Sequence, residues 1–450
     1  MNASQQKMNL IVVGGGPAGM TTAIAAARNG AKTLLIEQGS CLGGVATSGL
    51  LSIWGPFVDH DPCWDLSKST AIPEKAIARK RKVCGTPITQ GIAAELLDKL
   101  IILDGARDCQ NGFIPLNPET LKYVAEQMLD EAGARILYFS QVVDIIKNKN
   151  RIEAVIVANK AGLTTYDADV FVDASGDADL AAFAGAEFQK GRDQDGKMQG
   201  VTLVFRLGGV KIQGRIVVER EEVKRANSIF ENAWKKGMVS AQYHVGCINP
   251  IPGMDGVVAV NSQHTFDVDG TDPMDLTRAM FQGREDVREM AGLFKKYLRG
   301  FEDSFLIDTA PQVGVRETRR IVGEYMLTKE DVLQSKKFKD TIGRNAYNID
   351  IHLPSNKKQS LADLFPKGGT YHDIPYRSLI PKKMENLLVA GRSISATHEA
   401  QSSIRIMPCC MVTGQAAGTA AALSIKQKTF PRKLEIGLLQ DTLRKQNACV

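Results

Sequence analysis

Residues 10–20 read LIVVGGGPAGM, a short apolar run followed by a glycine-rich turn. The run Leu10–Val13 is continuous and rich in β-branched side chains, which is typical of a buried parallel strand. The turn supplies the pattern G-x-G-x-x-G: Gly14 allows a tight turn, Gly16 lets the backbone approach a pyrophosphate, and Gly19 lets the next helix pack closely. This order predicts a dinucleotide-binding unit whose helix directs its first N–H groups at phosphates.

The elements that follow continue this pattern. A helix is expected over Ala18–Asn29, with Gly30 as its stop. A second strand, Thr33–Ile36, ends in Glu37, and the carboxylate of this residue can hydrogen-bond a ribose hydroxyl at a spacing of roughly 20 residues from the glycines. The glycine-rich loop Cys41–Gly49 comes next and suits a long ligand that continues past its pyrophosphate. We therefore predict FAD as the cofactor. It is expected to be bound non-covalently, because no residue stands out as an attachment point.

Later segments also have the character of backbone that approaches a cofactor. The predicted strand Asp169–Asp173 leads into the small residues Ala174–Gly176, which permit a close approach. The apolar strand Asn386–Gly391 likewise ends in glycine. Gly414–Ala422 is a helix almost without side chains, and we expect its start, around Val412–Gly414, to direct the positive end of its dipole at the flavin pyrimidine.

These pieces together resemble bacterial FAD-dependent oxidoreductases of the glutathione-reductase-like flavoprotein superfamily. The matching segments are VVGGGPAGM (12–20), GGVATSG (43–49), VDASGDADLAAFAGA (172–186), VRETRRIVGEYMLTKEDV (315–332), IPYRSLIP (374–381) and NLLVAGRSISATHEAQSSIRIMPCCMVTGQAAGTAAAL (386–423). The resemblance implies an α/β fold in which a discontinuous Rossmann-like FAD-binding domain carries an inserted α/β substrate (capping) domain. Residues 134–146 are expected to form a strand that carries Val142 and Val143, and the resemblance implies that the backbone near these residues meets the adenine. An acidic residue often follows the glycine of the last strand in this superfamily, whereas Arg392 stands there in this chain.

The expected domain organisation follows from these segments. The FAD-binding domain comprises residues 1–50, 116–190 and 374–430, residues 51–115 insert near the flavin, residues 191–373 form the substrate domain, and residues 431–450 are a C-terminal extension. The candidate cofactor-binding residues lie in the glycine-rich turns, at the strand ends and in the small-residue helix: Gly14, Gly16, Pro17, Ala18, Gly19, Glu37, Gln38, Gly44, Val45, Ala46, Thr47, Val143, Ala174, Ser175, Gly176, Gly391, Arg392, Gly414 and Ala417.

Candidates for catalysis come from the histidines and from an arginine cluster. A flavoenzyme that oxidises a C–OH or C–N group needs a proton acceptor for the heteroatom. The histidines of the chain are His60, His244, His264, His352, His372 and His398. His398 is favoured because residues 395–406, which also include Arg405, lie between two expected flavin-contact segments; His352 and His244 are weaker candidates. Arg316 begins the cluster RETRR and can clamp a carboxylate or phosphate.

The bulk composition limits the remaining function classes. A net charge of +6 on 450 residues does not favour nucleic acid as a partner. No apolar run reaches the roughly 20 residues of a membrane span, and the N-terminus lacks the features of a secretory signal. The eight cysteines show neither CxxC spacing nor a metal-ligand pattern, so we expect no metal and mostly reduced thiols in a cytoplasmic protein.

The leading functional hypothesis is an FAD-dependent dehydrogenase or reductase. It transfers a hydride between flavin N5 and a small polar metabolite, which the arginine cluster suggests is anionic. Two alternatives stay open: a redox-neutral flavin-dependent epimerase or isomerase, and a non-catalytic FAD-binding electron-transfer subunit. The expected partner is a small-molecule substrate, without nucleic acid or membrane. A homo-oligomer is compatible with the sequence, and the electron acceptor is not indicated by it.

Overall fold

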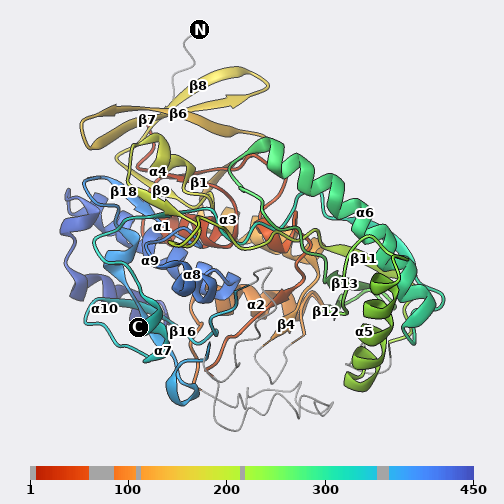
Figure 1. Ribbon diagram of the computed structural model, residues 1–450. Helices are drawn as coiled ribbons and strands as arrows, with labels where there is room; N and C mark the ends of the chain where they lie inside the picture. Colours follow the sequence, from red (N-terminus) through yellow and green to blue (C-terminus); the bar gives the residue numbers. More distant parts are fainter. Residues whose placement is uncertain (1–6, 60–85, 108–112, 213–217, 352–363) are drawn as a thin grey trace.

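A five-stranded parallel sheet forms the centre of the larger lobe in the computed structural model, which describes residues 7–59, 86–107, 113–212, 218–351 and 364–450 (Figure 1). The order of its strands is β18-β9-β1-β2-β5. Their bounds are β1 (Leu10–Val13), β2 (Thr33–Ile36), β5 (Arg135–Leu137), β9 (Val170–Asp173) and β18 (Leu387–Val389). Strands β1, β2, β9 and β18 are wholly buried, as expected for a parallel sheet covered on both faces.

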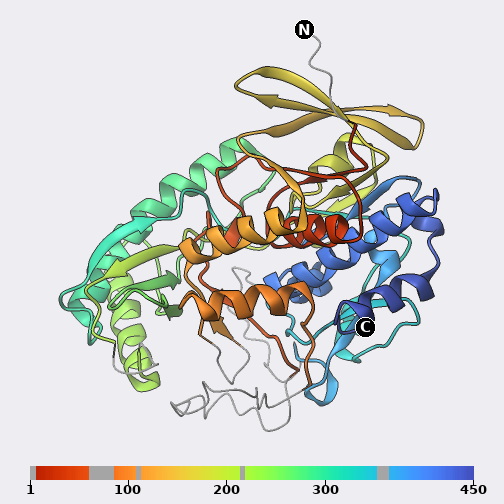
Figure 2. The ribbon, with the colours of Figure 1, turned by 180° about the vertical axis from the view of Figure 1, so that it is seen from behind.

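Helices cover one face of this sheet and a three-stranded antiparallel meander covers the other (Figures 1 and 2). The covering helices are α1 (Pro17–Arg28), α3 (Pro118–Ala132) and α9 (Met407–Lys426), with α2 (Ile92–Ile102) packed on α3 and α9. The meander consists of β6 (Gln141–Asn148), β7 (Arg151–Asn159) and β8 (Gly162–Asp167). The sheet therefore draws its strands from the separate ranges 1–50, 116–190 and 374–430.

The smaller lobe is built on a four-stranded antiparallel sheet with its own hydrophobic core. Its strands and helices are β11 (Phe205–Gly208), β12 (Cys247–Pro250), β13 (Val258–Asn261), β14 (Phe305–Thr309), α5 (Arg220–Lys235) and α6 (Pro273–Tyr297). Phe205, Phe230, Phe294 and Phe301 stack or meet edge to face at its centre. This core draws mainly on residues 201–315, whereas residues 321–349 contribute to the core of the larger lobe. The α/β fold with an FAD-type sheet and an inserted substrate domain is confirmed.

Short elements connect and extend the two lobes. They are β3 (Ile53–Trp54), β4 (Ile114–Pro115), α4 (Asp179–Phe183), β10 (Phe188–Lys190), β15 (Arg319–Ile321), α7 (Lys329–Leu333), β16 (Thr341–Asn345), β17 (His372–Pro375), α8 (His398–Ile404) and α10 (Ile436–Lys445). Within the expected C-terminal extension, α10 buries Leu439 and Leu443 in the larger core. Among the described residues, no single helix is long and apolar enough to cross a membrane. In the part of the chain that the structure describes, one pair of helices, α8 and α9, has such a length and composition when taken together, and the two are bent by 91° against each other.

Two predicted elements differ from the structure. The single strand expected over residues 134–146 is divided into β5 and β6, because the chain turns at Phe139, which has a φ of 51°. Val143 consequently belongs to the meander and not to the parallel sheet. The helix expected to start around Val412–Gly414 begins at Met407, with Pro408 in its first turn. Proline fits there, because the first turn of a helix does not use its N–H groups for internal hydrogen bonds.

The small residues of α9 allow it to lie directly against α1. A Cβ atom on Gly414 would come within 2.2 Å of the Ala18 carbonyl oxygen, and one on Gly418 within 2.1 Å of the Thr22 carbonyl oxygen. The Thr22 hydroxyl donates a hydrogen bond to the Gly414 carbonyl at 3.0 Å. The two helices therefore approach each other as closely as their backbones permit.

A Gly418→Ala variant is expected to lower the free energy of unfolding by about 1–3 kcal/mol, because the added methyl group must push two packed backbones apart. Gly292→Ala is the matched control, since a Cβ atom at this exposed position of α6 meets nothing within 4 Å. It should stabilise the helix by up to about 1 kcal/mol. Urea unfolding in excess FAD measures the free energy of unfolding of both variants. Equal effects of the two substitutions would contradict the packing argument.

His372 gives the stability of the protein a defined pH dependence. It is fully buried, its Nδ1–H donates to the Asp373 carbonyl, and its Nε2 accepts from the Asn345 amide. Burial lowers the pKa of His372 from 6.5 to about 4. The unfolded chain therefore binds this proton first, and stability is lost as the pH falls from 6.5 towards 4, by about 2 kcal/mol between pH 7.5 and pH 5. Urea unfolding of His372→Asn should show a correspondingly shallower slope; an unchanged slope would contradict this prediction.

Candidate active site

The three glycines of the first turn have different surroundings. Gly14 has a φ of 96°, and a Cβ atom on it would lie 2.6 Å from the Ala174 carbonyl oxygen. A Cβ atom on Gly19 would lie 1.7 Å from the Gly14 carbonyl oxygen. Gly16 has a φ of −67°, and a Cβ atom on it would meet nothing within 4 Å. Gly14 and Gly19 are therefore required by the packing of the chain, whereas Gly16 borders open space at the N-terminus of α1.

Glu37 closes the same turn from the end of β2. Its carboxylate accepts hydrogen bonds from the backbone N–H groups of Gly15 and Gly39, both at 2.6 Å. These two contacts fix the glycine-rich turn against the second strand. Each carboxylate oxygen has room for a second donor, so the side chain can still accept a hydrogen bond from a ligand hydroxyl.

The open space beside Gly16 is a cavity of about 540 Å³ that extends from the end of β2 to the start of α9. The predicted cofactor residues that line it are Gly16, Pro17, Ala18, Glu37, Gln38, Gly44, Val45, Ala174, Ser175, Gly176, Gly391 and Arg392. The predicted residues that support it from behind or lie elsewhere are Gly14, Gly19, Ala46, Thr47, Val143, Gly414 and Ala417. An elongated cavity bordered by a glycine-rich turn, a helix N-terminus and an acid fits a dinucleotide.

Sequence reasoning missed the part of this cavity that the smaller lobe supplies. Leu276 and Met280 reach it from α6, and residues 311–315 reach it from the segment after β14. Their sequence pattern is that of an ordinary amphipathic helix and a loop. Only the packing of one lobe on the other brings them to the cavity, so no local signal indicated them.

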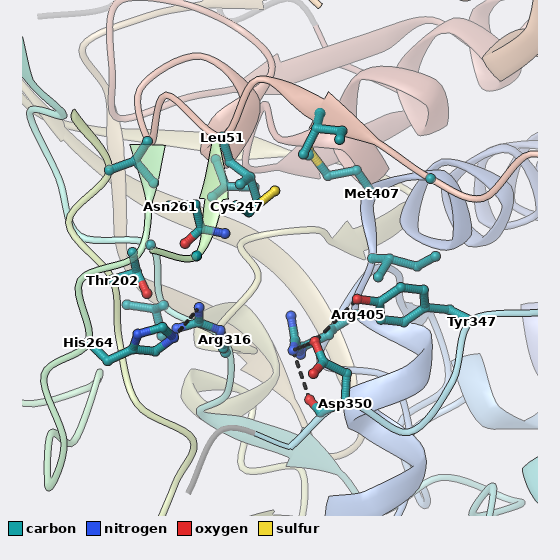
Figure 3. Close-up of a pocket in the computed structure, with 18 of the residues that line it drawn as sticks. Leu51, Thr202, Cys247, Asn261, His264, Arg316, Tyr347, Asp350, Arg405 and Met407 are labelled. Atoms are coloured by element: carbon teal, nitrogen blue, oxygen red, sulfur yellow. Dashed lines mark hydrogen bonds and ion pairs between the residues drawn. The ribbon is translucent and has the colours of Figure 1, made fainter. Parts of the chain in front are cut away.

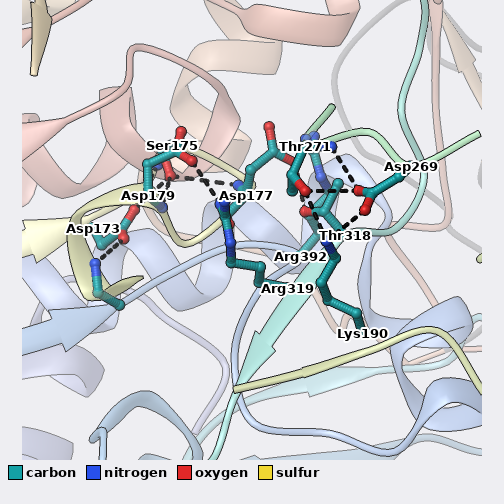
Figure 4. Close-up of polar contacts among 11 residues, drawn as sticks. Asp173, Ser175, Asp177, Asp179, Lys190, Asp269, Thr271, Thr318, Arg319 and Arg392 are labelled. Carbon is teal, nitrogen blue, oxygen red and sulfur yellow. Dashed lines mark hydrogen bonds and ion pairs between the residues drawn. The ribbon is translucent and has the colours of Figure 1, made fainter. Parts of the chain in front are cut away.

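Asp177 and Arg392 form an ion pair at the cavity wall (Figure 4). The Asp177 carboxylate accepts hydrogen bonds from Arg392 Nη2 at 2.7 Å and from the Thr318 hydroxyl at 2.6 Å. The buried Nε of Arg392 has no hydrogen-bond partner among the described residues. Arg392, which follows Gly391, is thus paired at the cavity wall with the carboxylate of Asp177.

A second cavity, of about 350 Å³, continues from the first (Figure 3). The two cavities share the lining residues Val45, Gly314, Val315, Arg392, Arg405 and Met407. The polar side chains of the second cavity are Thr202, His244, Cys247, Asn261, His264, Arg316, Tyr347, Asp350, Arg392 and Arg405. Because Met407 begins α9, the positive end of that helix dipole lies where the two cavities meet.

The predicted residues Arg316 and Arg405 both line this second cavity, but their partners differ. Arg405 donates to the Asp350 carboxylate at 3.2 Å and to the Asp350 carbonyl at 3.0 Å. Arg316 donates to the Gly200 carbonyl at 2.5 Å and to His264 Nε2 at 3.3 Å. Within the described part of the chain, no carboxylate forms a salt bridge with Arg316. Burial, followed by the nearby charge of Arg405, lowers the pKa of Arg316 to about 9, which still leaves it protonated at neutral pH.

The favoured catalytic histidine, His398, lies away from both cavities. His398 is buried and borders neither cavity; its Nδ1 lies 2.9 Å from Glu317 Oε1, inside a buried ion network. This position favours a structural role for His398. His352 lies outside the described residues. His264, which the sequence did not single out among the histidines, lines the second cavity together with His244, at a ring-centroid distance of 5.7 Å.

Comparison with known proteins places these features in a family. Residues 9–443 match the family described as FAD dependent oxidoreductase. Hydrogen cyanide synthase subunit HcnB of Pseudomonas protegens is 29% identical over 121 residues, which are 23% of this chain and only 22% of that protein. Two solved structures match at low identity. A geranylgeranyl bacteriochlorophyll reductase-like protein of Thermoplasma acidophilum is 13% identical, with a TM-score of 0.44 and coverage of 98% of this chain and 84% of that one. Glycine oxidase of Bacillus cereus is 14% identical, with a TM-score of 0.43 and coverage of 96% and 98%.

The family match spans nearly the whole chain, including both lobes and both cavities. The chain therefore belongs to the FAD dependent oxidoreductase family.

Proposed function

We propose that this FAD-dependent oxidoreductase transfers a hydride between FAD in the first cavity and a small organic anion in the second. The observation that carries the proposal is the position of Arg316: a guanidinium without a carboxylate partner among the described residues lines a cavity that opens into the cofactor cavity. FAD, when bound, supplies a two-electron centre that accepts or donates a hydride at N5.

The residues proposed to hold FAD surround the first cavity. Gly16 and the N-terminus of α1 provide space and N–H groups for the pyrophosphate. Glu37 provides an acceptor for ribose hydroxyls. The ion pair of Asp177 and Arg392 provides further polar contacts in the same cavity. The bound cofactor is proposed to be non-covalent. That the protein shares the glutathione-reductase-like class of this fold and comes from a bacterium also stays a prediction.

Charge supports an anion as the substrate. The second cavity is lined by three arginines and one aspartate, and that aspartate is already paired with Arg405. Arg316 is partly buried, and a bound carboxylate or phosphate would give its guanidinium a charge-assisted hydrogen-bond partner. Thr202 adds a buried hydroxyl in this cavity that has no hydrogen-bond partner in the described part of the chain.

Anaerobic reduction of the bound flavin tests this function. Small organic anions should bleach the oxidised-flavin absorption without an added acceptor. Arg316→Gln should weaken the response to the active anion by about 10–100-fold, the value of a charge-assisted hydrogen bond. Arg288→Gln, at an exposed position of α6, is the matched control. Activity of only neutral compounds, or an unchanged response in Arg316→Gln, would contradict the proposal.

The alternatives predict other results in the same experiment. A redox-neutral epimerase or isomerase would interconvert stereoisomers of an anion without net bleaching. An electron-transfer subunit would show no turnover of small molecules by itself and would associate tightly with another protein. The relative HcnB is named as a subunit of hydrogen cyanide synthase, so this alternative is kept.

A further inference from the structure

His264 stands beside Arg316 in the second cavity (Figure 3). Its Nε2 lies 3.3 Å from Arg316 Nη2, and its Nδ1 lies 3.2 Å from the Ser262 carbonyl oxygen. Its ring stacks with those of His244 and Phe266, at centroid distances of 5.7 and 6.1 Å. The imidazole is therefore held by two neighbouring rings and at both of its nitrogens.

These partners define the protonation state of His264. A guanidinium can only donate hydrogen bonds, so Nε2 must accept and carries no proton. A carbonyl can only accept, so Nδ1 must carry the proton. The ring is thus neutral, and the lone pair of Nε2 points towards Arg316. This is the state that a general base needs before it takes a proton from a substrate.

Three other titratable groups of this cavity, Asp350, Tyr347 and Cys247, suit that role less well, and the variant His244→Asn tests the second histidine of the lining. Asp350 is bound by Arg405 and accepts a hydrogen bond from Tyr347 Oη at 3.2 Å. Burial and the Asp350 charge raise the pKa of Tyr347, and burial raises the pKa of Cys247, so both stay protonated at neutral pH. His264, in contrast, has an Nε2 lone pair that lies next to the cationic side chain of Arg316.

We infer that the substrate is a 2-hydroxy carboxylate, whose carboxylate binds Arg316 while its hydroxyl gives a proton to Nε2 of His264. This inference rests on the proposed function. Arg316 Nη2 and His264 Nε2 lie 3.3 Å apart, a short separation that suits a carboxylate and a hydroxyl on adjacent carbons of the substrate. Their mutual hydrogen bond, at 3.3 Å, is long, so the substrate replaces it at little cost. An ammonium group in place of the hydroxyl would be repelled by the arginines, which disfavours 2-amino acids.

The step balances without a further reactant. The C–H bond at carbon 2 breaks and its electron pair leaves as a hydride to FAD, which is reduced by two electrons. The O–H bond breaks and its proton passes to His264 Nε2, which becomes an imidazolium. A C=O bond forms, and the substrate leaves as a 2-oxo carboxylate, oxidised by two electrons. The reverse reaction uses the imidazolium as the acid.

Positional isomers test the inference on the unmodified holoenzyme. Glycolate, both enantiomers of lactate, and malate are compared anaerobically with 3-hydroxypropionate and 3-hydroxybutyrate. At least one 2-hydroxy acid should bleach the flavin, and its 3-hydroxy isomer should be slower by about 100-fold or more, because a hydroxyl one carbon farther away misses the base. Equal rates for the two series, or bleaching by 2-amino acids such as alanine alone, would overturn the inference.

Variants then separate binding from proton transfer. Oxamate, an unreactive analogue of a 2-oxo acid, is titrated by its perturbation of the flavin spectrum, which does not depend on turnover. His264→Asn should slow bleaching by about 10²–10⁴-fold, the usual contribution of a general base, while oxamate affinity stays within about threefold. Arg316→Gln should weaken oxamate binding by about 10–100-fold.

Failures of the two proposals are distinguishable. If substrate bleaches the flavin of His264→Asn as fast as that of the unmodified enzyme, His264 is not the base. The same holds if only His244→Asn slows flavin bleaching. In both cases the proposed anion site at Arg316 is unaffected. If the 3-hydroxy acids both bind and react, the substrate class is wrong while the proposed function stands. If no acid of either series perturbs or bleaches the flavin, and oxamate does not bind, the proposed function falls and this inference falls with it.

Discussion

A Gly16→Val variant is expected to fold and to lose FAD. The backbone of Gly16 is extended, with φ −67° and ψ −174°, so a β-branched residue adopts it without strain. A Cβ atom at this position meets no protein atom within 4 Å, and the added isopropyl group would therefore project into the cofactor cavity. We expect the affinity for FAD to fall by about 100-fold or more, equivalent to about 3 kcal/mol, because the side chain occupies the space of the pyrophosphate.

The ratio of flavin to protein absorbance after purification, followed by titration of the apoprotein with FAD, measures this loss. Circular dichroism should show an unchanged content of helix and strand. Gly19→Val is the contrasting variant: its Cβ atom would lie 1.7 Å from the Gly14 carbonyl oxygen, so it should disrupt the turn itself. If Gly16→Val retained FAD at full stoichiometry, the pyrophosphate could not lie beside Gly16, and the assignment of the first cavity would be wrong.

The sequence predicts those elements of the fold whose local residue pattern also determines where they lie in the folded protein. Leu10–Val13, Thr33–Ile36 and the helix between them were identified because continuous apolar strands and a glycine-rich turn have few other uses. The sequence predicts the start of α9 too late, because Val412–Gly414 opens its run of small residues whereas the helix begins at Met407. Gly414 and Gly418 instead mark the crossing with α1, and a crossing partner nearly 400 residues away leaves no local signal.

The candidate site was predictable only where it is built from one segment. The backbone of the larger lobe that lines the first cavity could be predicted from glycines at strand ends. His398 was favoured because it stands near flavin-contact segments in the sequence, yet the structure turns its ring towards Glu317. His264 follows β13 in the smaller lobe and carries no motif. Its importance comes from the neighbouring Arg316, which lies 52 residues farther along the chain.

The network around Glu317 is the second place where a single substitution should have a large effect. The side chains of Glu317 and Arg320 are 0% and 1% exposed and form a salt bridge. Arg320 also donates to the Ala396 carbonyl at 3.0 Å and to the Gly191 carbonyl at 2.9 Å. This one guanidinium therefore joins β15 to the segment before α8 and to the loop after β10.

Arg320→Met is expected to lower the free energy of unfolding by about 3–5 kcal/mol, because it leaves the Glu317 carboxylate buried without its cation. Arg288→Met, at an exposed position of α6, should change the free energy of unfolding by less than about 0.5 kcal/mol. Urea unfolding in excess FAD measures both variants.

The double variant Glu317→Met/Arg320→Met identifies the cause of the loss. If the penalty comes from an uncompensated charge, removing that charge should recover at least about 1 kcal/mol relative to the sum of the two single variants. If the loss comes only from the carbonyl groups that Arg320 leaves unbonded, the two single effects should add. A loss in Arg320→Met no larger than in Arg288→Met would mean that water reaches Glu317 and that the segment before α8 is held by other contacts. A coupled loss would instead show that the buried pair itself holds β15 against the segment before α8.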